Sequence, residues 1–178
     1  MTTQPDVEPP VPQGWRKRGL AGFAGLIGPL WVRKEDEGWA YGLLATADHL
    51  NPAGVVHGGL LTALLDHGIS AIAWEALGRR ACVTVQLDTH FLAAAREGQF
   101  LEVRGRVARA TSSLVFMQGA LSTDGQVVAT AVAVLKQVGA AAAGGPAPGD
   151  PAAGDPAAGD PAAGDPAAGG PAAGAAAK

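Results

Sequence analysis

The sequence predicts an α+β domain in which one long central helix packs against a single antiparallel β-sheet. Residues 59–77 form the one long apolar stretch that suits a helix, and Gly78 ends it. After this stretch the spacing of apolar residues changes from about 3.6 to about 2, which is typical of strands. Two more strand-like runs precede the helix, so strands from both sides of it can form one sheet.

The elements expected before the long helix are a short amphipathic helix, a strand hairpin and a loop. Glycine and proline separate them, because these residues end helices and form turns. They cover residues 15–27 (helix), 30–35 and 39–46 (strands, joined by the turn 36–38) and 51–54 (loop of sequence Asn-Pro-Ala-Gly).

Four strands are expected after the long helix, which closes with Gly78 and two arginines near the negative end of its dipole. Short turn-like segments separate the alternating runs. The predicted strands are 81–92, 100–110, 113–122 and 126–138, with turns at 96–98, 111–112 and 123–125.

The ends of the chain differ in composition from its middle. Residues 139–178 consist almost entirely of Ala, Gly, Pro and Asp, with the repeated unit Pro-Ala-Ala-Gly-Asp. Such a segment has almost no large apolar side chains to bury, so it cannot offset the entropy of ordering its backbone. We therefore expect one domain over residues 14–138, a disordered N-terminus over 1–13 and a disordered tail over 139–178.

Charge and cysteine content narrow the class of protein. The whole chain has a net charge of −3, whereas residues 14–138 carry 12 Lys and Arg against 10 Asp and Glu, which is +2. This weakly positive domain suits a phosphate-bearing ligand but lacks the basic stripe of a nucleic-acid binder. Cys82 is the single cysteine, which excludes an intrachain disulfide and favours a cytoplasmic protein. The apolar run 19–32 is too short to cross a membrane.

The beginning of the long helix is suited to bind a developing negative charge. His57, Gly58 and Gly59 lie where backbone N–H groups have no helical acceptor, and glycine lets a ligand approach the backbone closely. An oxyanion formed from a thioester carbonyl needs such donors, which often lower a barrier by about 3 kcal/mol. Taken alone, a histidine here caps the helix or packs in the core, and paired glycines form a turn.

Asp66 lies two turns further along the same helix, among apolar residues. A carboxylate there is costly unless it is paired or exposed in a cleft, and partial desolvation would raise its pKa toward that of a useful base. The alternative is a buried carboxylate held by a neighbouring hydrogen bond. Helical spacing places one polar or small-sided face beside an apolar stripe. The first consists of Thr62, Asp66, Ser70 and Ala73, and the second of Leu61, Leu65, Gly68 and Ile72.

The combination of these residues is more specific than any one of them. Asn51-Pro-Ala-Gly-Val-Val-His57-Gly58-Gly59, followed by Asp66, resembles the motif of hotdog-fold acyl-CoA thioesterases of the phenylacetate-degradation (PaaI-like) type. The resemblance continues through Val83-Thr84-Val85-Gln86-Leu87 and covers residues 20–136. It implies a hotdog fold, in which an antiparallel sheet wraps around one long helix, and two subunits that join their sheets edge to edge.

The resemblance also implies a role for each motif residue. Asn51 would orient the substrate or the attacking water, and the Gly58 N–H would polarise the thioester carbonyl. Asp66 of the partner subunit would act as general base or nucleophile, with the Thr84 hydroxyl positioning water and His57 in a supporting role. The implied protein is a homodimer or a dimer of dimers that needs no cofactor or metal, because CoA is part of its substrate.

Other residues are weaker candidates. The CoA phosphates would be held by Arg79, Arg80, Arg96 or Arg109, and Gly59 would allow the substrate close to the backbone. Trp74 and Phe91 are expected in the core, and Cys82 is expected to be buried and inert. His67 departs from the family pattern and could change the pKa of the neighbouring Asp66.

Three other functions remain open at this stage. A hotdog hydratase or dehydratase would use His57 and Asp66 for proton transfer at carbon, and a non-catalytic acyl-CoA sensor would bind without hydrolysis. A metal hydrolase would need ligands from the four histidines, but their spacing matches no metal motif. These histidines are His49, His57, His67 and His90.

Overall fold

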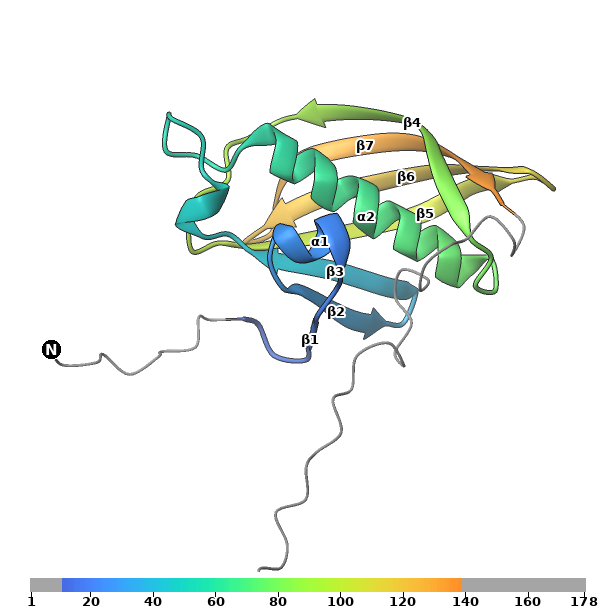
Figure 1. Cartoon of the computed structure of the whole chain (residues 1–178), viewed down its shortest axis with the longest axis horizontal. Coiled ribbons are helices and arrows are strands. Elements are labelled where there is room, and N and C mark those ends of the chain that lie inside the picture. The colour runs from blue at the N-terminus through green and yellow to red at the C-terminus, as the bar shows by residue number, and fades with distance from the viewer. Residues whose placement is uncertain (1–10, 139–178) are drawn as a thin grey trace, which may run out of the picture.

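The computed structural model describes residues 11–138, and it has the predicted α+β architecture: a seven-stranded antiparallel sheet curved around one long helix (Figure 1). The strand order is β1-β2-β3-β5-β6-β7-β4. The elements in chain order are β1 (Arg16–Arg18), α1 (Gly22–Leu26), β2 (Leu30–Glu35), β3 (Gly38–Leu44), a 3-10 turn (Ala47–His49), α2 (Gly58–Ala76), β4 (Cys82–Phe91), β5 (Phe100–Ala110), β6 (Leu114–Thr123) and β7 (Gln126–Gln137).

The predicted disorder of the chain ends falls mostly outside the described residues. Residues 1–10 and 139–178 are not described, so the expected tail and most of the expected N-terminal segment lie outside the structure. Val11 is described, and it packs beside a small cluster formed by Trp15, Ala40 and Phe100.

The predicted helix over residues 15–27 is wrong in its first half. Arg16–Arg18 forms strand β1, which pairs antiparallel with β2, and only Gly22–Leu26 is helical. The cause is tertiary: Trp15 is buried against the ring of Phe100, 4.9 Å away between centroids, which fixes the chain along the sheet. Gly22 has φ +66°, a conformation that interrupts a helix between the two segments.

The core forms where α2 crosses the concave face of the sheet. The predicted apolar stripe of α2 is buried, and so are Leu64 and Ile69 beside it; the stripe consists of Leu61, Leu65, Gly68 and Ile72. Two glycines allow the helix and the sheet to approach closely. A Cβ on Gly68 would lie 2.7 Å from Val103 Cγ1, and one on Gly119 would lie 2.6 Å from Ile69 Cδ1. Larger residues at either position would push the helix off the sheet.

Strand β4 forms one edge of the sheet. Within residues 11–138 it pairs only with β7, and its register shifts between Thr84 and Gln86, which marks a β-bulge at Val85. The side chain of Val85 is 61% exposed, so a ten-residue edge presents apolar surface as well as unpaired backbone groups. Such an edge is normally covered by another element or another chain. No helix within residues 11–138 is long and apolar enough to cross a membrane.

An ion-pair network joins β2 to β5 on the face of the sheet opposite α2. Arg104 donates to Glu35 through Nη2 at 2.8 Å and Nε at 2.9 Å, and Arg33 Nη2 donates to the same carboxylate at 2.6 Å. Hydrogen bonding from Arg104, only partly opposed by burial, lowers the pKa of Glu35 from 4.5 to about 2, and Arg33 adds to the effect. Glu35 therefore stays ionised in the folded state well into acid.

This network predicts a pH-dependent contribution to stability. The ionised Glu35 should stabilise the fold above pH 4.5. This contribution should be lost as the pH falls from 4.5 to about 2, because Glu35 takes up a proton in the unfolded chain over this range but stays ionised in the folded protein. We expect the difference in free energy of unfolding between wild type and Glu35→Gln to shrink over that range. Urea denaturation at a series of pH values measures it.

Glu37→Gln, in the exposed turn between β2 and β3, serves as the matched control and should not show this pH dependence. A Glu35→Gln difference that stays constant down to pH 2 would contradict the assignment.

Candidate active site

The beginning of α2 presents one backbone donor without an acceptor. His57 is the N-cap residue, and its carbonyl accepts hydrogen bonds from the N–H groups of Leu60 (2.9 Å) and Leu61 (3.3 Å). The Gly59 N–H donates to His57 Nδ1 at 2.8 Å. The Gly58 N–H has no acceptor among the described residues, and the helix dipole adds positive potential at this end. The Gly58 N–H is thus available to an external oxygen atom.

Asn51 holds the loop that leads into this helix. Its Oδ1 accepts hydrogen bonds from the N–H groups of Ala53 (2.9 Å) and Val55 (3.4 Å), and its own N–H donates to the Val55 carbonyl at 2.8 Å. The side-chain oxygen is therefore occupied in the turn. The remaining amide nitrogen, Nδ2, can only donate, so Asn51 can offer a hydrogen bond to an oxygen atom beside the loop.

Asp66 and Thr84 meet between α2 and β4. The Thr84 hydroxyl donates to Asp66 Oδ1 at 2.7 Å, and the Ser70 hydroxyl lies 3.4 Å from Thr84 Oγ1. The bulge at Val85 shifts the register of β4 next to Thr84, as bulges often do beside functional sites. The predicted face of Thr62, Asp66 and Ser70 is partly open, whereas Ala73, predicted on that face, is fully buried.

His67 does not bring a positive charge to Asp66 near neutral pH. Burial lowers the pKa of His67 below 6.5, and the attraction of Asp66 only partly offsets this effect. Its ring lies edge-on to Tyr41, with 6.2 Å between the centroids. The departure from the family pattern at His67 therefore places a neutral imidazole beside the carboxylate.

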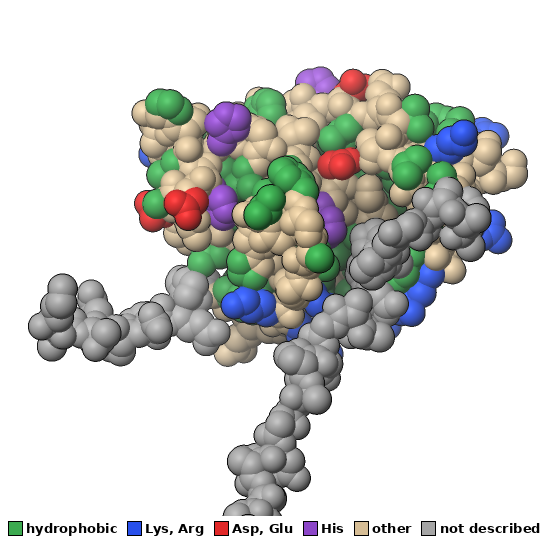
Figure 2. Space-filling model, viewed as in Figure 1, with side chains coloured by type: hydrophobic (Ala, Val, Ile, Leu, Met, Phe, Trp, Pro, Cys, Tyr) green, Lys and Arg blue, Asp and Glu red, His purple; other side chains and the backbone are tan. Residues whose placement is uncertain are grey.

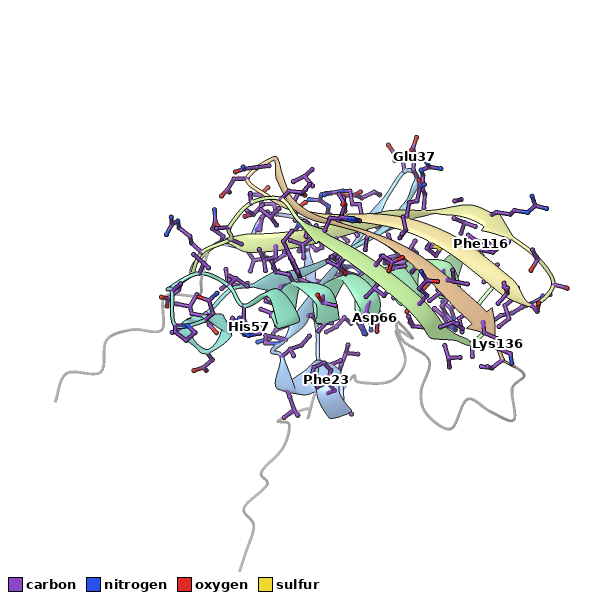
Figure 3. The ribbon with its side chains drawn as sticks, turned by 90° about the horizontal axis from the view of Figure 1, so that it is seen from above. Phe23, Glu37, His57, Asp66, Phe116 and Lys136 are labelled. Atoms are coloured by element: carbon purple, nitrogen blue, oxygen red, sulfur yellow. The ribbon has the colours of Figure 1, made fainter. Side chains whose placement is uncertain are left out.

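The two groups of polar residues lie apart along the helix. Gly58 and Asp66 are separated by eight residues, a rise of about 12 Å in an α-helix. Figure 3 shows His57 at the beginning of α2 and Asp66 further along the same helix. One chain therefore cannot bring the Gly58 N–H and the Asp66 carboxylate to the same carbonyl group.

The four candidate arginines sort to two ends of the sheet. Arg79 follows α2, lies over the ring of Trp74 at 5.1 Å and is 4.0 Å from Glu75. Arg80 and Arg109 lie at that same end of the sheet, because β4 begins there and β5 ends there, and both side chains are exposed. Arg96 is exposed at the opposite end, next to Ala95, whose carbonyl accepts from the Val56 N–H.

Of the three residues expected to be buried, Trp74 is buried as predicted, but Phe91 and Cys82 are not fully buried. Phe91 is 54% exposed, because β4 is an edge strand and its last residues lie beside the helix start. A Cβ on Gly58 would be 3.2 Å from the Phe91 ring, so this ring lies beside the Cα of Gly58. Cys82 was expected to be buried, but it is only partly so, again because it lies on the edge strand, and its S–H donates to the Arg80 carbonyl at 3.7 Å.

His49 has a role that the sequence did not reveal. Its Nδ1 accepts a hydrogen bond from the Thr46 N–H at 3.0 Å, so the ring proton is on Nε2, which donates to the Ile27 carbonyl at 2.9 Å. The ring thereby connects the 3-10 turn to the end of α1, 22 residues away. No spacing rule signals such a long-range contact. Among residues 11–138, no group of three or more His, Cys, Asp or Glu side chains could hold a metal ion.

Comparison with known proteins gives a consistent family. The family model described as the thioesterase superfamily matches residues 53–130. A Pseudomonas aeruginosa protein named "Putative esterase PA0474" is 33% identical over 111 residues, which cover 61% of this chain and 83% of that protein.

Solved structures agree in fold. A Ralstonia eutropha JMP134 structure, titled "putative thioesterase, phenylacetic acid degradation-related protein", is 34% identical, with a TM-score of 0.54 over 59% of this chain and 82% of that one. A hypothetical thioesterase protein of Streptococcus pneumoniae TIGR4, solved with coenzyme A, is 24% identical, with a TM-score of 0.56 over 62% of this chain and 86% of that one. The second likeness establishes the fold alone.

The hydrogen bond at the helix start predicts the tautomer of His57. Because Nδ1 accepts from the Gly59 N–H, neutral His57 should carry its proton on Nε2. Long-range ¹H–¹⁵N NMR of the neutral ring should show an unprotonated Nδ1. In Gly59→Ala the added Cβ would lie 2.9 Å from Nδ1, so the ring must move and the tautomers should mix.

Gly19→Ala is the matched control for this experiment, since a Cβ at Gly19 meets nothing within 4 Å. A protonated Nδ1 in the wild type would show that the cap is not formed as described.

Proposed function

The chain belongs to the thioesterase superfamily and is a thioester hydrolase, and from this premise we propose that its substrate is an acyl-CoA, cleaved to the free acid and CoA. The acyl group proposed is a small aromatic one or a short- to medium-chain aliphatic one. The observation that carries the proposal is the Asp66 carboxylate, held at 2.7 Å by the Thr84 hydroxyl on a partly open face of α2.

The proposed active site is shared by two subunits. The donors at the beginning of α2 and the Asp66 carboxylate are about 12 Å apart along one helix, so they complete one site only when each comes from a different chain. The edge strand β4 supports this arrangement, because it carries Thr84 and presents unpaired backbone groups together with the exposed Val85. Pairing of β4 with its copy in a two-fold homodimer would cover this edge.

The proposed reaction uses each group for one task. The Gly58 N–H of one subunit and the Asn51 amide donate hydrogen bonds to the thioester carbonyl oxygen, where negative charge develops. Asp66 of the partner subunit accepts a proton from water, and the water oxygen bonds to the carbonyl carbon. The C–S bond then breaks, and the proton on Asp66 passes to the leaving CoA sulfur, which restores the carboxylate. In the alternative form, Asp66 attacks the carbonyl carbon itself and water releases the acid afterwards.

His57 and Thr84 support these groups rather than react. His57 accepts from the Gly59 N–H, which leaves Gly58 as the outward donor at the helix start. The Thr84 hydroxyl orients the Asp66 carboxylate and an attacking water beside it. All four candidate arginines are exposed. For the CoA phosphates, Arg80, Arg96 and Arg109 are the proposed contacts, because Arg79 already lies on Trp74 and near Glu75.

Asp66→Asn tests the role of the carboxylate. The amide keeps the shape of the side chain and removes the proton acceptor, so thiol release from acyl-CoA should slow by about 100-fold, the usual scale for a lost acid–base group. The measurement is free-thiol release from a panel of aromatic and aliphatic acyl-CoAs.

Asp36→Asn is the matched control, since Asp36 is an exposed carboxylate in the turn between β2 and β3. Equal rates for wild type and Asp66→Asn would overturn the role of Asp66. A wild type that binds acyl-CoA but releases no thiol would favour a sensor or a hydratase instead.

Subunit mixing tests whether the site is shared. Asn51→Ala and Asp66→Asn impair different halves of the proposed site, so each homodimer should be nearly inactive. Random mixing makes half of the dimers heterodimeric, each with one intact site, so about a quarter of wild-type activity should return. Co-expression with two affinity tags, followed by thiol-release assay, measures this. Activity no higher than the mean of the two homodimers would show that the site lies within one chain.

A further inference from the structure

A cavity of about 680 Å³ lies between α1 and the beginning of α2. Figure 3 shows Phe23 of α1 on the same side of α2 as His57, away from the sheet. The walls are largely apolar and come from strands β1, β2 and β3, from α1, from the 3-10 turn and from the first two turns of α2. Its apolar lining includes Phe23, Leu26, Trp31, Leu44, Leu60 and Ala63.

The cavity begins beside the proposed oxyanion donor. His57 and Gly59, the two neighbours of Gly58 in the sequence, both line it. A thioester whose carbonyl oxygen accepts from the Gly58 N–H would therefore have its acyl group next to the mouth of the cavity. We infer that this cavity receives the acyl group and selects an uncharged medium-chain acyl-CoA over acetyl-CoA; the inference rests on the proposed function.

The α1 wall has apolar surface that the fold itself does not use. Phe23 is 67% exposed and Leu26 is 83% exposed, although both line the cavity. Figure 2 shows hydrophobic side chains standing out of the face that carries α1, with histidine side chains nearby. Because burial of apolar surface is favourable, an alkyl chain in the cavity would cover part of both side chains.

The position of α1 over the cavity is fixed by His49. The ring connects the Ile27 carbonyl to the Thr46 N–H, so both of its nitrogen atoms are used within the protein. His49 lines the cavity and yet offers no free polar group to an occupant. Lys17 and Asp48, the charged residues of the lining, are both exposed and of opposite sign. The cavity therefore suits an acyl group without charge.

The size of the cavity favours more than two carbons. Pockets of about 300–1,000 Å³ can bury most of the surface of a small ligand, and an acetyl group would leave this one nearly unfilled. Each methylene that enters an apolar site should raise kcat/KM by about fourfold. Thiol release from acetyl-, butanoyl-, hexanoyl- and octanoyl-CoA should therefore rise steeply along the series.

Ala63→Met tests the cavity directly, because Ala63 lies in its α2 wall. The longer side chain would occupy the space of the acyl chain, so the ratio of kcat/KM for octanoyl-CoA to that for butanoyl-CoA should fall about tenfold or more. Ala76→Met, at the exposed end of the same helix, is the matched control and should keep the wild-type ratio. Thermal unfolding of both variants checks that they fold.

Phe23→Ala provides a second test that does not depend on tolerance of a larger residue. It removes an exposed part of the α1 wall, so the fold should persist while the octanoyl-to-butanoyl ratio falls. A flat chain-length profile, or equal effects of both variants on octanoyl- and butanoyl-CoA, would overturn the assignment while leaving the thioesterase proposal intact. No thiol release by the wild type from any acyl-CoA would instead overturn the proposed function, and this inference with it.

Discussion

The close packing of α2 on the sheet is the constraint on which the rest of the structure depends. Gly68 and Gly119 remove the side chains that would hold helix and sheet apart, and Val103 and Ile69 fill the space instead. Because one face of the helix is buried so tightly, the opposite face keeps room for a polar side chain. Asp66 can remain partly open there without breaking the core. At the beginning of α2, the Gly58 N–H has no acceptor within residues 11–138.

Strand β4 contacts both groups of candidate site residues on α2. It follows α2 directly and lies at the edge of the sheet, so it is close enough for Thr84 to reach Asp66 and is still available for another chain. Its other end brings Phe91 beside Gly58. The strand therefore touches both groups of polar residues, about 12 Å apart, and in the proposed dimer its copy would carry the complementary pair.

Much of the fold was predictable because its signals are local. The apolar stripe of α2 and the alternation of the later strands follow from helix and strand geometry, and the motif from Asn51 to Asp66 indicated where the polar residues gather. The wrong predictions, the helix over residues 16–18 and the burial of Phe91, share one cause: burial depends on contacts between residues far apart in the sequence. The sequence could not show that Trp15 packs on Phe100 and makes 16–18 a strand, or that Phe91 ends an edge strand and stays exposed. The contact of His49 with Ile27 spans 22 residues and has no pattern.

Two groups of exposed apolar side chains lie near the proposed site. One group lies on β4, including Val85 and Phe91, and the other on α1, with Phe23 and Leu26; further exposed ones, Phe116, Val127 and Val132, lie on β6 and β7. An isolated apolar residue on a surface needs no explanation, but a fold keeps contiguous ones at a cost in solubility. The two groups flank the beginning of α2 from opposite sides: Phe91 borders Gly58, and Phe23 lines the cavity that His57 and Gly59 share. A second subunit on β4 would cover the first group, and an acyl chain under α1 would cover the second. Both would exclude water from the thioester carbonyl that the Gly58 N–H polarises. A hydrogen bond to that carbonyl is stronger without water, because the local dielectric is lower.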